Sequence, residues 1–187
     1  MKKGKLLLNW QKEPVGVYLG DNNVFWLLSQ RQSKISNKQM LACFYQENGL
    51  QGADLSSVNL RGANLRGADL SGAILTYAYL RFVNLRGADL SGADLTCSNL
   101  THAKLRGADL RGANLEGVYQ RSADLRDANL EGANLEGADL SGAYLMSVNL
   151  KGAYLMSVNL EGANLTGANY NQNTTWPVGF DKSRLSS

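Results

Sequence analysis

The chain has 187 residues, 44% of them hydrophobic, and a formal net charge of +3. This length suits one domain with an appendage and allows a continuous buried core. The charge is +4 over residues 1–50 (seven basic, three acidic), −2 over 51–170 (ten against twelve) and +1 over 171–187 (two against one). So mild a balance gives no electrostatic argument for a nucleic acid or an anionic membrane as partner. No apolar run approaches the ~20 residues that a membrane-spanning helix needs.

Residues 1–49 contain no repeat, and we expect either a folded cap or a small interaction module there. The start, MKKGKLLLNW, is too short for the apolar region of a signal peptide, and no small-residue cleavage site follows it, which favours a cytoplasmic protein. Residues 15–28 predict a hairpin around the GDNN sequence at 20–23. Residues 36–48 predict a helix that begins at Ser36 and ends before Gly49.

A five-residue repeat, Ala-(Asp/Asn)-Leu-(Arg/Ser/Thr/Glu)-Gly, runs from residue 51 to residue 170 without an insertion. A period of five fits neither an amphipathic helix nor an alternating strand. Two inward residues per unit, followed by polar residues and glycine, describe a short extended segment and a sharp turn. Four such sides would close a coil of 20 residues. Six coils stacked at the strand spacing of ~4.8 Å would give a rod about 29 Å long.

The A(D/N)LXX units resemble the pentapeptide-repeat family over residues 51–170, and the ending YNQNTTWPVGFD resembles that of cyanobacterial members. The resemblance implies an all-β fold, the right-handed quadrilateral β-helix, here with about six coils and a partly helical N-terminal cap region. The expected divisions are residues 1–49, 50–170 and 171–187. Leucine-rich repeats are the alternative architecture, but they lack a strict five-residue period.

The ends of such a rod need covering, because a solenoid exposes its leucine layers there. Trp176 and Phe180 are placed to cover the last layer, and we expect them to form the C-terminal cap. The family resemblance also implies that a homodimer could form through an end of the rod.

Residues typical of catalysis or metal binding are sparse. The single histidine, His102, falls at an outward turn position, so we expect a solvated side chain and no metal site. The glycines do not form a phosphate-binding loop, and the recurring aspartates fall on different sides of the rod. Cys43 and Cys97 are too few for a disulfide framework and indicate free thiols. We therefore expect neither an enzyme nor a cofactor.

Residues 20 apart would stack in columns, and one column holds the arginines 66, 86, 106 and 126. Aspartates stand three residues later, at 69, 89 and 109. We expect each arginine to pair with the aspartate of its own RGAD step, as a charge-compensated surface ladder.

Aromatic residues gather in neighbouring columns of the middle coils. The candidate protein-binding patch consists of Tyr77, Tyr79, Phe82, His102 and Tyr119. Clustered exposed aromatics are typical of an interface core; the alternative is drift at tolerant surface positions. The duplicated AYLMSVNL sequence offers a weaker candidate contact, which consists of Tyr144, Met146, Tyr154 and Met156.

From Leu50 to Leu165 every fifth residue is leucine except Gln120. In a regular coil this amide points into the core between Leu100 and Leu140, where it needs partners. Alternatively, the chain bulges at residues 118–121 and turns the amide outward.

The leading functional hypothesis is a non-enzymatic scaffold that presents a flat side to an unidentified protein partner. The alternative comes from the quinolone-resistance pentapeptide proteins, which mimic DNA and inhibit a type II topoisomerase. That role requires a strongly anionic rod, whereas this repeat region carries only −2.

Overall fold

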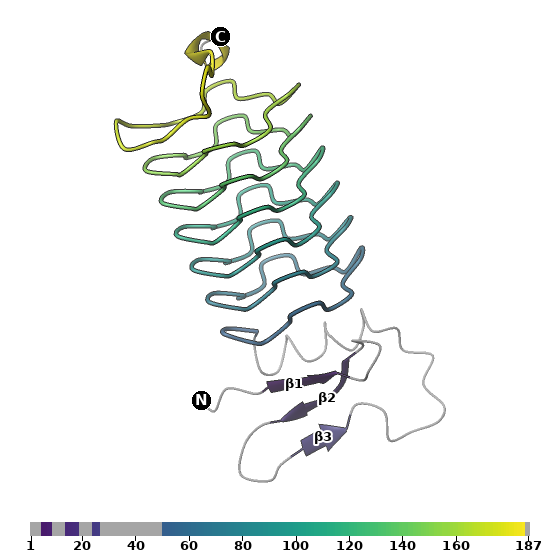
Figure 1. The fold of residues 1–187 in the computed structure, drawn as a ribbon. Helices are drawn as coiled ribbons and strands as arrows, with labels where there is room; N and C mark the ends of the chain where they lie inside the picture. Colours follow the sequence, from purple (N-terminus) through teal and green to yellow (C-terminus); the bar gives the residue numbers. More distant parts are fainter. Residues whose placement is uncertain (1–4, 9–13, 19–23, 27–49, 186–187) are drawn as a thin grey trace.

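The computed structural model describes residues 5–8, 14–18, 24–26 and 50–185 (Figure 1). Near the N-terminus, β1 (Lys5–Leu8), β2 (Pro14–Tyr18) and β3 (Val24–Trp26) form an antiparallel sheet in that order. The pairing of Gly16 with Trp26 and of Tyr18 with Val24 confirms the predicted hairpin. Strand β1 was not predicted, because its leucines run together without alternation. The helix predicted at residues 36–48 lies outside the described residues.

From residue 50 onward the chain winds into stacked coils that form a rod (Figure 1). Isolated parallel bridges join residues 20 apart, so four five-residue units make one coil. The four sides of a coil start their bridge ladders at Asp54, Asn59, Asn64 and Asp69, and we number them first to fourth in that order. The bridges between residues 20 apart thus confirm the predicted 20-residue coil.

Each side ends in a turn of the same geometry. The N–H of Ala53 donates to the Leu50 carbonyl at 3.1 Å, and Gly52 between them has φ = +62°. A positive φ at the third residue of a hydrogen-bonded four-residue turn is the signature of type II. The same sign of φ recurs two residues after each leucine position through Gly167, which explains why glycine is common there.

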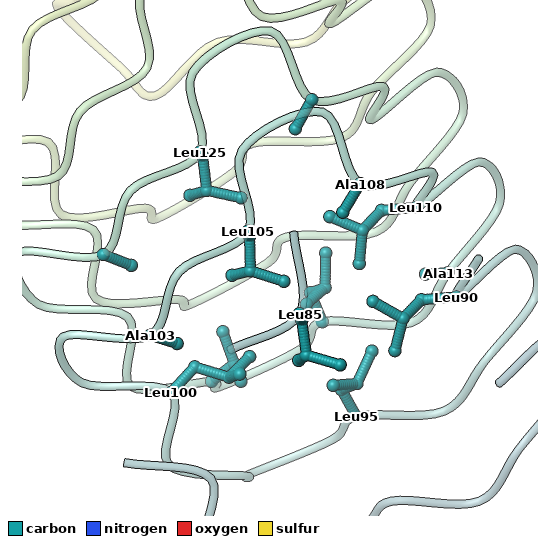
Figure 2. Close-up of a cluster of buried hydrophobic side chains, with 14 of the residues drawn as sticks. Leu85, Leu90, Leu95, Leu100, Ala103, Leu105, Ala108, Leu110, Ala113 and Leu125 are labelled. Atoms are coloured by element: carbon teal, nitrogen blue, oxygen red, sulfur yellow. The ribbon is translucent and has the colours of Figure 1, made fainter. Parts of the chain in front are cut away.

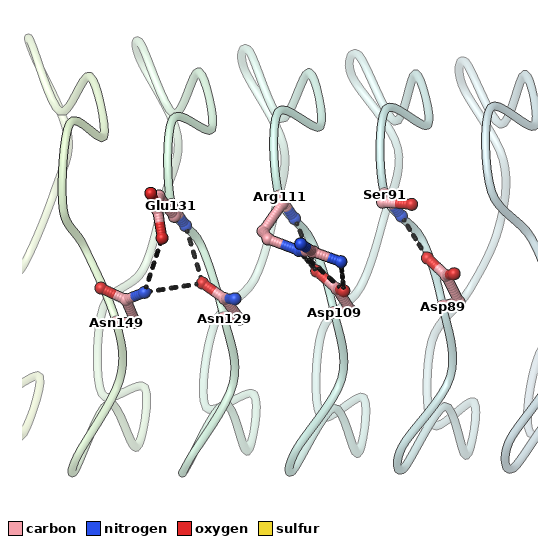
Figure 3. A network of polar contacts seen from close by, with 7 residues as sticks. All are labelled: Asp89, Ser91, Asp109, Arg111, Asn129, Glu131 and Asn149. Atoms are coloured by element: carbon pink, nitrogen blue, oxygen red, sulfur yellow. Dashed lines mark hydrogen bonds and ion pairs between the residues drawn. The ribbon is translucent and has the colours of Figure 1, made fainter.

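The Asp or Asn before each leucine has a turn function of its own. Between Asp54 and Asn164, every Asp or Asn at this position accepts a hydrogen bond from the N–H two residues later, at 2.9–3.4 Å. Figure 3 shows this bond from Ser91 to Asp89 and from Glu131 to Asn129. Short carbonyl side chains suit this local bond, so the turn explains the A(D/N)L motif.

The core is a column of leucines bordered by small residues. Leu85, Leu90, Leu95 and Leu100 come from successive sides of one coil and are at most 1% exposed (Figure 2). From Leu55 to Leu165, the Ala, Val or Ser two residues before each leucine position points inward beside it. Each buried leucine contributes roughly 1.5–3 kcal/mol relative to an exposed one, which makes the leucine column the main stabilising element of the rod.

Gln120 is inside this core, and the chain does not bulge there. Its N–H donates to the Asp139 carbonyl at 2.8 Å and its carbonyl accepts from Ala123 at 3.0 Å, as in any regular unit. The side chain is 0% exposed. Neither its amide nitrogen nor its amide oxygen has a hydrogen-bond partner among the described residues, and the same holds for the buried hydroxyl of Ser98 on the same side. The inward alternative is therefore correct and the bulge is wrong.

The last coil ends in an irregular tail. Thr175 pairs with Tyr154, one residue more than the usual step, and Asn171 supplies a side-chain oxygen to the N–H of Gly152 at 3.0 Å. The 3-10 helix η1 (Lys182–Leu185) follows, where the Arg184 guanidinium donates to the carbonyls of Leu160 (2.9 Å) and Ala163 (3.0 Å). These bonds satisfy backbone acceptors at an edge that no further coil covers.

Trp176 and Phe180 lie against the buried core cluster at this end. Their rings stack with centroids 4.5 Å apart, and the ring of Tyr170 meets Trp176 edge-on at 5.6 Å. Leu185, which the sequence analysis did not single out, is also buried there.

Candidate protein-binding surface

The structure places the five residues of the candidate protein-binding patch, which we call the aromatic patch, on the second side and its two bordering turns. Tyr79 and Tyr119 belong to one ladder, with Asn99 between them, and are 56% and 53% exposed. The coil spacing places them roughly 10 Å apart. Tyr77 lies in the turn before this side and Phe82 in the turn after it, at 62% and 49% exposed.

Phe82 and His102 occupy the same turn position in successive coils. Their rings stack at 5.1 Å with an interplanar angle of 12°. The Arg81 guanidinium carbon lies 4.8 Å from the centroid of the Phe82 ring, a cation–π distance. The Phe82 ring thus contacts both His102 and Arg81 while about half of the residue stays exposed.

The backbone under the patch is in a conformation that disfavours its side chains. Tyr77, Phe82 and His102 have φ values of 57°, 61° and 58°, in the left-handed region. Bulky residues rarely adopt this region, at a cost of order 1–3 kcal/mol each. Glycine occupies the same position in most units, so folding alone does not require aromatics there.

The expected pairing of arginine with aspartate inside each RGAD step is wrong. Asp69 accepts hydrogen bonds from the N–H and hydroxyl of Ser71, at 3.0 and 2.6 Å. Asp109 instead binds Arg111, at 2.5 Å (Figure 3). The carboxylates turn toward the N–H groups of the following turn, away from the preceding arginine. This turn hydrogen bond is the competing interaction that the charge pattern alone did not reveal.

The two arginines of the column that lie nearest the C-terminus form ion pairs with other aspartates. Arg106 binds Asp127 at 2.9 Å and Arg126 binds Asp124 at 2.7 Å. The hydrogen bond from Arg126 holds the pKa of the Asp124 carboxyl below its usual value, although desolvation opposes the shift. The pKa of Asp109 is lowered in the same way by Arg111.

The duplicated AYLMSVNL sequence does not form one surface. Tyr144 lies in a ladder between Asp124 and Asn164, on the third side. Tyr154 lies in the ladder that ends at Thr175, on the first side. Ten residues are half a coil, so the duplication places its tyrosines on opposite sides of the rod.

Within the described residues, no group of three or more His, Cys, Asp or Glu side chains is arranged to hold a metal ion. Cys97 is a free thiol at intermediate exposure. In the same part of the chain, none of the helices has the length and apolar character to traverse a lipid bilayer.

Coils of a fixed five-residue unit, closed every four units, define a solenoid repeat protein. The sequence matches the family described as Pentapeptide repeats in eight copies, at residues 53–92, 84–119, 123–162 and 148–169. The chain therefore belongs to the pentapeptide-repeat family.

Solved structures of cyanobacterial members are similar to this chain. HetL of Nostoc sp. strain PCC 7120, a protein involved in heterocyst differentiation regulation, is 34% identical over 65% of this chain, with a TM-score of 0.51; the match spans 61% of HetL's own length. Rfr23 of Cyanothece 51142 is 33% identical over 66% of this chain and 90% of its own, with a TM-score of 0.45. The protein alr5209 of Nostoc PCC 7120 is 30% identical over 83% of this chain and 98% of its own, with a TM-score of 0.36. No curated protein sequence matches the chain significantly.

Proposed function

We propose that this protein is a non-enzymatic, cytoplasmic interaction scaffold whose aromatic patch binds a protein partner. The rod offers a rigid support, because every coil is fixed by backbone hydrogen bonds to its neighbours. Exposed tyrosines at a fixed spacing provide large contact area at low conformational-entropy cost, which suits them as binding anchors.

The observation that carries this proposal is the left-handed backbone under Tyr77, Phe82 and His102. These side chains are solvent-exposed, yet they occupy a backbone conformation that favours glycine. Strain that folding does not require is typical of a binding site. Two orphaned polar side chains, Ser98 and Gln120, lie inside this same side, where the repeat departs most from its rule.

The finer architecture belongs to the same proposal. We take the rod to be a right-handed quadrilateral β-helix of about six coils, which the 20-residue step of the ladders supports. Residues 1–49 would form a cap or a small module, and Trp176 and Phe180 the C-terminal cap. A homodimer through an end of the rod is compatible with this arrangement.

The test is affinity purification of the tagged protein from its source organism, followed by mass spectrometry, with wild type and the double variant Tyr79→Ala/Tyr119→Ala. We expect the double variant to lose the specific partner by at least tenfold while its melting temperature changes little, because both side chains are more than half exposed. The matched control is Tyr144→Ala/Tyr154→Ala, which removes two exposed tyrosines from other sides. Equal recovery of the partner by all three proteins contradicts the proposal.

Topoisomerase inhibition is the competing function, and a gyrase supercoiling assay separates the two. We expect no inhibition at low micromolar protein, because a DNA mimic needs negative charge around the rod and this rod carries a dense arginine column.

A further inference from the structure

The net charge of −2 on residues 51–170 conceals a strong asymmetry across the rod. Arg66, Arg86, Arg106 and Arg126 lie in the turns after the third side. Arg61, Arg81 and Arg121 lie in the turns before it, and Lys104 lies on it. Only Asp124, Asp127 and Glu161 oppose them there, so this side carries +5 (eight minus three). The other three sides carry −7 (two minus nine).

Ion pairing leaves the positive charge concentrated in the first three coils. In the coils nearer the C-terminus, Arg121 binds Asp139. Arg126 binds Asp124, and Arg106 binds Asp127. Among the described residues, no carboxylate forms an ion pair with four of the remaining cations, namely Arg61, Arg66, Arg81 and Lys104. Arg86 reaches Asp124 only at 3.8 Å. We call these five residues the basic strip.

The basic strip runs along the third side and its two bordering turns. Its arginines stand in two columns, separated by three extended residues, or roughly 10 Å, and repeat along the rod at about 4.8 Å. Asn64 and Asn84 lie between the columns, joined by a hydrogen bond of 3.0 Å. On one edge, Arg66, Arg86, Arg106 and Asp127 line an open depression of about 380 Å³.

The geometry points to an acidic, extended segment of a protein partner bound along the basic strip. The guanidinium fork matches a carboxylate in two parallel hydrogen bonds. An extended peptide, with same-face side chains every ~6.6 Å, can reach both columns within two or three coils. A nucleic acid fits less well, because its affinity depends on many phosphate contacts and the strip is only five charges long within a rod whose other sides carry −7.

The inference rests on the proposed function, because the two surfaces meet at one corner. Arg81 belongs to the basic strip, and its guanidinium lies over Phe82 of the aromatic patch. One partner could thus place apolar groups on the second side and an acidic segment on the third. Charge asymmetry of this kind orients an approaching partner and accelerates association.

The test measures fluorescence anisotropy of labelled deca-glutamate, deca-glutamine and decathymidylate with the full chain at low salt. We expect deca-glutamate to bind more tightly than both other probes, and its affinity to fall as NaCl is added. Arg66→Gln/Arg86→Gln should weaken it at least fivefold. The matched control Arg111→Gln removes an arginine from the turn between the fourth and first sides, where it binds Asp109, and should change the affinity less than twofold.

Three results would overturn the inference: no binding of deca-glutamate, tighter binding of decathymidylate, or an equal loss in Arg111→Gln. Circular dichroism melts of each variant verify folding. Replacement of exposed arginines should leave the melting temperature unchanged. Tyr79→Ala/Tyr119→Ala should retain deca-glutamate binding. The anisotropy measurement therefore tests the basic strip separately from the partner recovery that tests the aromatic patch.

Discussion

Gln120 interrupts a column of leucines with an amide that has no hydrogen-bond partner among the described residues. A buried orphan of this kind costs about 1–3 kcal/mol, and the missing leucine forgoes burial of apolar surface as well. We expect Gln120→Leu to raise the free energy of unfolding by on the order of 2 kcal/mol, measured by urea denaturation.

The matched control is Leu140→Gln, one coil further in the same column, which should lower the free energy of unfolding by a comparable amount. A Gln120→Leu variant that unfolds at lower urea than wild type would show that the amide is satisfied in solution. Loss of the partner in that variant, with improved stability, would tie the core irregularity to binding.

Turns are the elements that decide which substitutions the rod accepts. Gly92 has φ = +62°, and a Cβ built there meets no atom within 4 Å. Gly92→Ala should therefore lose stability through backbone conformation alone, by about 1–2 kcal/mol.

Phe82→Gly should gain stability, because it releases the same strain at an exposed position. Both are measured as shifts of the urea midpoint, and a stability loss in Phe82→Gly would mean that its stacking with His102 outweighs the strain.

The lowered pKa values of aspartates on the sides predict that acid destabilises the rod. The pKa of Asp124 is lowered in the folded state, chiefly by the hydrogen bond from Arg126. Its stabilising contribution is therefore present above the unfolded pKa of about 3.9 and is lost as the pH falls through the lower, folded pKa. Asp124→Asn should unfold more easily than wild type at pH 5, and the difference should shrink by pH 2.

Asparagine is the right replacement for this measurement. Asn64 and Asn84 accept the same turn hydrogen bond that Asp124 accepts, so the variant removes the charge and keeps the turn. A stability difference that stays constant between pH 5 and pH 2 would assign the effect to packing rather than to the ion pair.

For the whole molecule, the period of five and the inward leucines were sufficient to predict the coil. Each unit repeats the same short extended segment and the same turn. The contacts between side chains were less predictable. The RGAD pattern suggested pairs across a turn, whereas Asp69 and Asp109 use their carboxylates for the turn that follows. Likewise, the sequence pattern predicted the aromatic patch. The contact of Arg81 with the Phe82 ring depends on side-chain rotamers, which no periodicity encodes.

The C-terminal end tests whether the rod behaves as a finite solenoid. Trp176 and Phe180 cover buried core residues, and Arg184 donates to carbonyls that no further coil can reach. Removing residues 171–187 should expose an apolar layer and unpaired strand edges, which favour edge-to-edge association. We expect the truncated chain to form larger species by light scattering, whereas Trp176→Ala lowers the melting temperature with little association. A truncated chain with the same mass and melting temperature as wild type would show that the tail is dispensable, and that the last coil is stable with its edge open to water.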